Sequence, residues 1–359
     1  MDSVAHLPAN EQLDASGVML REAWYYALPS QALARGAMTH KAMLGEPILI
    51  GRDSAGAVFA LCDTCPHRGT LLSRGTFNGR EVQCAYHGWR FATDGQCTAI
   101  PSQTADQKPQ AADIHAKRYR VAESQGNIWV YIGAAKTLPP IPQVPAIGDR
   151  QQLHVAMTFD CNIDLAAIGL MDPAHGAFVH RSKLWRSEDS IHEKRKSFSP
   201  LPESEGLGWR MDRHVASSNS RAYRIFLGGA PETEISYRIP SVRIEHAHTA
   251  KYDYCGLTAC TPVDATHTEV HHVMYWNVPL GGLLRPIVRA FARRFLDQDR
   301  RAVMAMVEGL AFNPTTILVQ DADTQTRWYY RLKREALAAQ MENRSPRNPL
   351  QRVTLSWRS

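Results

Sequence analysis

The sequence predicts an α+β protein with antiparallel sheets and flanking helices. Between about residues 40 and 100, short apolar runs alternate with polar residues and are separated by Gly or Asp-Gly, which is typical of strands and turns. A second series of alternating runs lies between about residues 195 and 280. Two later segments, LLRPIVRAFARRFL and TQTRWYYRLKREALAAQ, predict helices. Because 359 residues can bury two hydrophobic cores, we expect two domains.

The charge of the chain indicates no particular class of partner. The formal net charge is +6, and basic residues alternate with acidic ones, so nothing points to nucleic acid. Arg285, Arg289 and Arg293 form a basic row that could meet an acidic protein or an anionic membrane surface; a solvated helix face is the simpler interpretation. The start of the chain lacks a signal-peptide pattern and no apolar run suits a transmembrane helix, so we expect a cytoplasmic protein.

The cysteines predict metal ligation rather than disulfides. Their number is odd and they are scattered, which makes a poor disulfide framework in a chain without a secretion signal. The seven are Cys62, Cys65, Cys84, Cys97, Cys161, Cys255 and Cys260.

Four residues in two loops predict an iron–sulfur cluster. Cys65 and His67 lie in one loop, and Cys84 and His87 lie in the next, each at the end of an expected strand. A [2Fe-2S] cluster of the Rieske type needs two thiolates on one iron and two imidazoles on the other, and each loop supplies one of each. A structural zinc site is the less favoured alternative, because it usually pairs Cys with Cys and His with His.

These loops resemble the Rieske domain of aromatic-ring-hydroxylating oxygenases and related O-demethylases. The run from Tyr86 to Phe91, the segment 100–102 and the segment 24–26 match that pattern. Respiratory Rieske proteins instead carry extra cysteines, at positions occupied here by Thr70 and Tyr86. By this resemblance Trp89 shields the cluster, which is compatible with its being a plain core aromatic.

A second motif, Asp172-Pro-Ala-His175-Gly-Ala-Phe-Val-His180, predicts a mononuclear metal centre. On an ideal helix two residues five apart diverge by about 140°, so His175 and His180 can converge only if the helix ends or distorts between them. Gly176 permits this. Asp172 followed by Pro173 predicts a helix start. Two histidines and one carboxylate form the facial triad of non-haem iron(II) oxygenases.

The resemblance implies that the carboxylate comes from an Asp near the C-terminus. Asp299 shares its helical stripe with apolar residues and should point inward, whereas Asp297 shares its stripe with arginines and should point outward. An Asp on an apolar face is costly unless it is paired or binds a metal, so we expect Asp299 to be the ligand. Asp321 and Asp323 are alternatives that look more like a helix cap.

Two further features concern the surroundings of this motif. The resemblance implies that Asp172 links His175 to His87 of the partner subunit in a homotrimer; a helix cap alone is the alternative. Family members commonly have Glu-Asn where this chain has Ile168-Gly169, which puts any polar role of those two positions in doubt. Five other histidines are expected to be strand-face residues, because no carboxylate or cysteine lies beside them at ligand spacing: His246, His248, His267, His271 and His272.

The resemblance, which extends from Trp24 to about Gln340, implies a division of the chain. We expect an N-terminal segment (1–40) that packs on the catalytic domain, a Rieske [2Fe-2S] domain (41–140), a helix-grip type catalytic domain with mononuclear Fe(II) (141–345) and a C-terminal tail (346–359).

The implied function is that of the oxygenase component of a Rieske monooxygenase, similar to vanillate O-demethylase and pheophorbide a oxygenase. It would use O2 and electrons from a reductase or ferredoxin to hydroxylate a hydrophobic ring-containing substrate, leading to oxidative demethylation. A polycyclic molecule and a small methoxyaromatic acid both stay open as substrates. The alternatives are a ring cis-dihydroxylating dioxygenase and, from another class, a Rieske electron-transfer protein.

Overall fold

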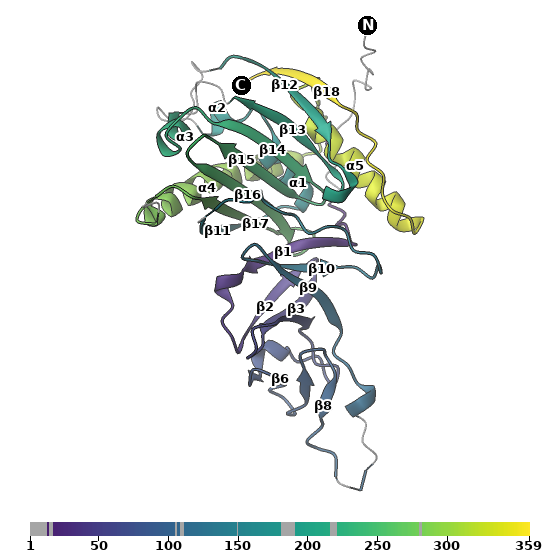
Figure 1. Cartoon of the computed structure of the whole chain (residues 1–359). Coiled ribbons are helices and arrows are strands. Elements are labelled where there is room, and N and C mark those ends of the chain that lie inside the picture. The colour runs from purple at the N-terminus through teal and green to yellow at the C-terminus, as the bar shows by residue number, and fades with distance from the viewer. Residues whose placement is uncertain are drawn as a thin grey trace. The chain divides into compact units, whose positions relative to one another are not determined.

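The computed structural model describes residues 13, 17–104, 106–107, 111–148, 150–180, 191–215, 221–279 and 282–359. For residues 221–223, only the backbone is described. The described residues divide into two compact units. The small unit comprises residues 21–143 and 261–264, and the large unit comprises residues 1–20, 144–260 and 265–359 (Figure 1).

The small unit consists of two antiparallel sheets. The six-stranded sheet has the order β1-β10-β9-β4-β3-β2, and the four-stranded sheet has the order β5-β6-β7-β8. Their strands are β1 (Ala23–Pro29), β2 (Ala37–Met43), β3 (Glu46–Arg52), β4 (Val58–Cys62), β5 (Thr76–Phe77), β6 (Glu81–Gln83), β7 (Arg90–Ala92), β8 (Cys97–Ala99), β9 (Arg118–Ser124) and β10 (Asn127–Ile132). Short 3-10 turns lie at Ser30–Ala32, Leu72–Arg74 and Ala111–Asp113.

The first strand belongs to the small unit. Six of its seven residues are buried, and β1 pairs along its length with β10, which is buried throughout. A strand covered on both faces has to be apolar throughout, as this one is. Residues 21–40 are therefore part of the small unit, whereas the sequence predicted a segment 1–40 that packs on the other domain. The pairing of β1 with β10 joins residues about 100 positions apart, which local patterns do not reveal.

The large unit is one antiparallel sheet with helices. The strand order is β11-β17-β16-β15-β14-β13-β12-β18. Its strands are β11 (Gln151–Phe159), β12 (Glu193–Pro200), β13 (Gly208–Val215), β14 (Glu232–Arg238), β15 (Val242–His248), β16 (Asp253–Pro262), β17 (Thr268–Trp276) and β18 (Val353–Arg358). Its helices are α1 (Ile163–Met171), α2 (Gly176–Val179), α3 (Arg221–Phe226), α4 (Arg285–Leu310) and α5 (Thr324–Met341), with a 3-10 turn at Glu203–Glu205. The predicted antiparallel sheet and the two predicted late helices are thus confirmed.

Helix α1 is fixed between α4 and α5. A Cβ atom added to Gly169 would lie 2.5 Å from Cγ2 of Val303, so glycine allows α1 and α4 to approach closely. On the other side of α1, Lys333 of α5 donates to both carboxylate oxygens of Asp164 at 2.6 Å, and all these atoms are buried. These contacts fix α1 near both of its ends, Asp164 in the first turn and Gly169 in the last turn before the second motif begins.

Within the part of the chain that is described, no helix combines the length and apolar character that a membrane crossing requires.

Candidate metal centres

The two Cys-His loops of the small unit share one backbone design. In each loop the cysteine N–H donates to the carbonyl five residues later at 2.8 Å, and the cysteine carbonyl accepts from the glycine four residues later. These glycines, Gly69 and Gly88, have φ values of 76° and 69°, in the left-handed region that favours glycine. Both loops therefore turn sharply, so that the side chains of Cys65 and Cys84 face the same interior.

The four predicted cluster ligands lie together. Cys65 and Cys84 are buried, and the imidazole rings of His67 and His87 are 4.5 Å apart between centroids. Nδ1 of His67 is buried and has no hydrogen-bond partner among the described residues. Burial raises the pKa of the Cys65 thiol to about 11, so an iron ion would have to displace its proton. Two inward thiols beside an unsatisfied imidazole nitrogen fit a Rieske-type [2Fe-2S] cluster.

Two residues, Trp89 and Asp63, hold the first Cys-His loop in place. The indole of Trp89 stacks on His67 with centroids 4.6 Å apart and planes 4° from parallel, which agrees with the shielding role implied for it. The carboxylate of Asp63 is fully buried; it accepts from the backbone N–H and the hydroxyl of Ser73 and lies 2.6 Å from Nδ1 of His40. Asp63 thus ties the two ends of this loop together, a role that its sequence neighbourhood does not signal.

In the large unit, three predicted ligands converge. Nε2 of His175 and Nε2 of His180 are 3.2 Å apart. Oδ1 of Asp299 lies 3.4 Å from the former and 3.0 Å from the latter. This is one of two groups among the described residues that bring three potential ligand atoms within 4.8 Å of one another. The carboxylate of Asp299 is buried, as the helical periodicity predicts, while Asp297 forms ion pairs with Arg300 and Arg301.

The orientation of the two imidazoles suits a metal ion. Nδ1 of His175 lies 2.8 Å from the carbonyl oxygen of Asp172, and Nδ1 of His180 lies 3.1 Å from Oε1 of Gln298. Since both neighbours are acceptors, each Nδ1 carries the ring proton and each Nε2 presents a lone pair. Three acceptor atoms then point at one another, and Oδ1 of Asp299 has no hydrogen-bond partner in the described structure. Only a cation relieves this arrangement, either a metal ion or a proton.

The electrostatics of the group agree with this interpretation. For His175, burial acts to lower the pKa, but the nearby carboxylates of Asp299 and Asp172 outweigh burial and raise it. For Asp299, burial acts to raise the pKa, and contacts with His175 and His180 lower it overall. The ring of the half-buried Phe295 stacks on His180 at 3.5 Å between centroids and so covers one face of that imidazole. The donor set of two imidazoles and one carboxylate fits iron(II).

The local backbone differs from the prediction at Asp172. Instead of starting a helix, Asp172 is the C-cap of α1, and its Oδ1 accepts from the backbone N–H of Ala174 at 2.7 Å. Pro173 disfavours a helical conformation at the residue before it, so α1 ends here. The single turn α2 fills the interval between the two histidines, with His175 as its N-cap and His180 as its C-cap. The helical turn therefore ends at His180 and not at Gly176.

Several other candidates lie outside both centres. Asp321 accepts from the N–H of Ser356, and Asp323 accepts from the N–H of Val319, so neither alternative carboxylate joins the triad. Buried His271 contacts His154, and the ring of His272 lies 2.8 Å from Oγ1 of Thr258. Sequence reasoning missed Gln298; a polar residue directly before an inward Asp is the only signal that the sequence offers.

A cluster that relays electrons and a separate mononuclear iron centre in one chain define the class of Rieske-type non-haem iron oxygenases. The sequence matches the model of the Rieske [2Fe-2S] domain over residues 23–121. It also matches the model of the vanillate O-demethylase oxygenase C-terminal domain over residues 159–342, more than half of the chain. The chain therefore belongs to the Rieske non-haem iron oxygenase family.

Individual relatives agree with this assignment. The oxygenase subunit of 3-chlorobenzoate-3,4-dioxygenase from Comamonas testosteroni is 31% identical over 175 residues, or 48% of this chain and 40% of the relative. The oxygenase component of dicamba O-demethylase from Stenotrophomonas maltophilia is 31% identical over 45% of this chain and 48% of the relative. The chain thus matches less than half the length of each. The structure of dicamba monooxygenase bound to dicamba superposes on this chain with a TM-score of 0.73 at 20% sequence identity. The match covers 90% of this chain and 99% of the dicamba monooxygenase chain, and it confirms the α+β fold.

Proposed function

We propose that the chain is the oxygenase component of a Rieske-type monooxygenase that hydroxylates a hydrophobic ring-containing substrate, with oxidative demethylation as the outcome. The observation that carries this proposal is the convergence of the lone pairs of His175, His180 and Asp299, in the same chain as the paired Cys-His loops. An electron carrier needs only the loops. A buried, unpaired carboxylate beside two imidazoles costs stability and is explained by a second metal centre.

We propose that Cys65, His67, Cys84 and His87 hold the [2Fe-2S] cluster and that His175, His180 and Asp299 hold Fe(II). When bound, the cluster supplies electrons one at a time and the mononuclear iron supplies a site for O2. The chain's own residues prepare that site. The carbonyl of Asp172 and the side chain of Gln298 hold the two imidazoles in the tautomer that ligates, and Phe295 keeps water from one side of His180.

Asp172 is the candidate for communication between the two kinds of centre. Its carboxylate is partly exposed and its Oδ2 lies 3.7 Å from Nδ1 of His175. One of its oxygens is thus directed toward an iron ligand while the side chain stays accessible. We propose that Asp172 also contacts His87 of the partner subunit in a homotrimer.

We propose further that a separate reductase or ferredoxin donates the electrons. A cytoplasmic location stays a prediction.

The substrate would bind on the sheet face that is turned toward Asp299. His272 of β17 contacts Thr258 and Tyr254. Burial lowers the pKa of His272, and the charges of Arg243, Glu245 and Asp299 also act on it, so its ring lies within electrostatic range of the centre. These polar groups lie among buried residues of β16 and β17, and the ion pair of Arg243 and Glu245 on β15 lies nearby. Such a lining suits a mainly apolar ring that carries one or two polar substituents.

Ring cis-dihydroxylation is the rival reaction, and the relative named as a 3,4-dioxygenase is the observation in its favour. The relative named as an O-demethylase favours monooxygenation.

Product analysis with ¹⁸O2 separates these functions. The reconstituted protein, with a reductase and ferredoxin of broad specificity, is incubated with methoxyaromatic acids, polycyclic methyl ethers and unsubstituted arenes. We expect one atom of ¹⁸O per turnover: a hydroxylated product keeps it, whereas a methyl ether gives an unlabelled phenol and loses the label with the released formaldehyde. Two labelled atoms in a cis-diol would establish the dioxygenase instead. The His175→Ala/His180→Ala double variant is the control, and reduction of its cluster without product formation excludes a failure of electron supply.

A further inference from the structure

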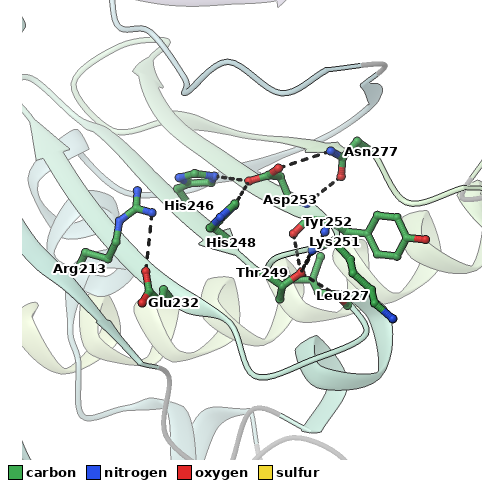
Figure 2. Close-up of polar contacts among 10 residues, drawn as sticks. All are labelled: Arg213, Leu227, Glu232, His246, His248, Thr249, Lys251, Tyr252, Asp253 and Asn277. Atoms are coloured by element: carbon green, nitrogen blue, oxygen red, sulfur yellow. Dashed lines mark hydrogen bonds and ion pairs between the residues drawn. The ribbon is translucent and has the colours of Figure 1, made fainter.

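A second group of potential metal ligands lies at the end of the β15–β16 hairpin. His246 and His248 are two residues apart on β15 and therefore point to the same face of the sheet. Asp253 begins β16 and is paired directly with His248. Its Oδ1 atom lies 2.9 Å from Nε2 of His246 and 2.8 Å from Nδ1 of His248 (Figure 2). The sequence led us to expect no carboxylate beside these histidines, and the strand register overturns that expectation.

The group has the same donor set as the proposed iron centre. Each consists of two imidazole nitrogens and one carboxylate oxygen, and in each these atoms lie within 4.8 Å of one another. In the iron centre the carboxylate lies 3.0 and 3.4 Å from the two nitrogens, so the hairpin group is slightly more compact. A tetrahedral cation with ligand bonds of about 2.0–2.1 Å would hold these atoms about 3.3 Å apart, so the imidazoles need to move outward by only roughly half an ångström to bind one.

The carboxylate of Asp253 is held in a fixed orientation. Its backbone N–H donates to Oδ1 of Asn277 at 2.7 Å, and Nδ2 of Asn277 donates to Oδ2 of Asp253 at 3.4 Å (Figure 2). This leaves Oδ1 to face the histidines. Carboxylates that ligate metals are commonly oriented by such a hydrogen bond to the other oxygen.

The surrounding charges also suit a cation. Glu232 and Glu234 of β14 are paired with His248 and His246, so both carboxylates lie on the same face as the group. Glu232 is 4.0 Å from Arg213 (Figure 2) and Glu234 is 3.6 Å from Arg210, and these long ion pairs compensate the two charges only in part.

The two histidines differ in their burial. His246 is only 9% exposed, yet its Nδ1 has no hydrogen-bond partner among the described residues. This nitrogen lies on another edge of the ring than Nε2, the atom that faces Asp253 and would bind the cation. By contrast, His248 is 44% exposed along its side chain, so the group opens to solvent on one side.

We propose that His246, His248 and Asp253 bind one divalent transition-metal cation of the zinc type, with water completing its coordination, at a site distinct from both iron centres. The site would clamp the β15–β16 hairpin to the end of β17 through Asn277. Because one ligand is exposed, the cation would exchange with solvent, and its release would loosen this end of the sheet.

Zinc binding to the iron-loaded, untagged protein tests the proposal. Equilibrium dialysis against ZnCl2 with elemental analysis should give one bound zinc with no loss of iron, and zinc should raise the Tm. His248→Ala and Asp253→Asn should each weaken zinc binding by at least about tenfold. His267→Ala, at an exposed histidine outside the group, should bind as the unchanged protein does.

Two results would overturn the proposal: zinc uptake that is unaffected by His248→Ala, or uptake that disappears in the His175→Ala/His180→Ala variant. The latter would assign the zinc to the iron centre. If Asp253→Asn does not fold, His248→Ala decides, because it changes a partly exposed side chain. The proposal is independent of the oxygenase reaction, since its readout is zinc and not product.

Discussion

Gln298 and Asp299, consecutive residues of α4, contact opposite nitrogens of the same imidazole. Oε1 of Gln298 is 3.1 Å from Nδ1 of His180, and Oδ1 of Asp299 is 3.0 Å from Nε2. Side chains of neighbouring helix residues diverge by about 100°, so they can reach both edges of a ring that lies across the helix. One helical turn therefore fixes the position and the tautomer of His180.

Replacement of Gln298 by Leu should weaken the mononuclear iron centre. The change removes the acceptor at Nδ1 of His180, so the ring is free to take the tautomer that protonates Nε2. We expect iron affinity at this centre to fall about 10- to 100-fold. Anaerobic dialysis measures it, with the two cluster irons as an internal standard. Asp297→Asn, one residue earlier on the solvent side, should keep full iron content; equal loss in both variants would refute a specific role.

Gly169 and Val303 should be coupled energetically. Gly169→Ala gains about 1 kcal/mol in helix propensity, but overpacking against Val303 costs about 1–3 kcal/mol. The net effect should be destabilising in the unchanged protein and stabilising in a Val303→Ala background. A double-mutant cycle of urea unfolding measures the coupling, and strictly additive effects would contradict the close approach of α1 and α4.

The buried pair of Asp164 and Lys333 should be sensitive to the loss of one partner. Lys333→Met leaves an uncompensated carboxylate in the core and should cost about 3–5 kcal/mol of unfolding free energy. Replacing both residues, by Leu and Met, should recover much of that loss. The matched control is Arg331→Met, an exposed position on the same helix, where the change should stay within about 0.5 kcal/mol.

His272 should make the protein less stable in acid. Burial lowers its pKa to about 4, whereas in the unfolded chain it titrates near its ordinary value of about 6.5. Below that value the unfolded state binds the proton first, so stability falls as the pH drops from about 6.5 to about 4, by about 2 kcal/mol at pH 5. His272→Gln should therefore lose less Tm than the unchanged protein between neutral pH and pH 5. His267→Gln, at an exposed histidine, should lose as much Tm as the unchanged protein does. Identical pH profiles for the unchanged protein and both variants would be evidence against the buried neutral ring of His272.

Local sequence patterns were sufficient to predict the candidate metal ligands that lie close together in the sequence or on one face of a helix. The mixed Cys-His loops and the pair His175 and His180 are adjacent in sequence, and helical periodicity placed Asp299 inward. Asp253 could not be predicted, because it meets His248 only through the register of a hairpin. The position of β1 depended likewise on a pairing between distant segments. Asp172 was misread because an Asp before Pro can end a helix as well as start one.

The count of irons and acid-labile sulfides per chain tests the central claim, that two sets of ligands hold two separate iron centres. Reconstituted protein should contain three irons and two sulfides. The His175→Ala/His180→Ala variant should contain two irons and two sulfides, with the visible spectrum of the cluster unchanged. A variant that still holds three irons, or one that loses the cluster along with the third iron, would contradict the account.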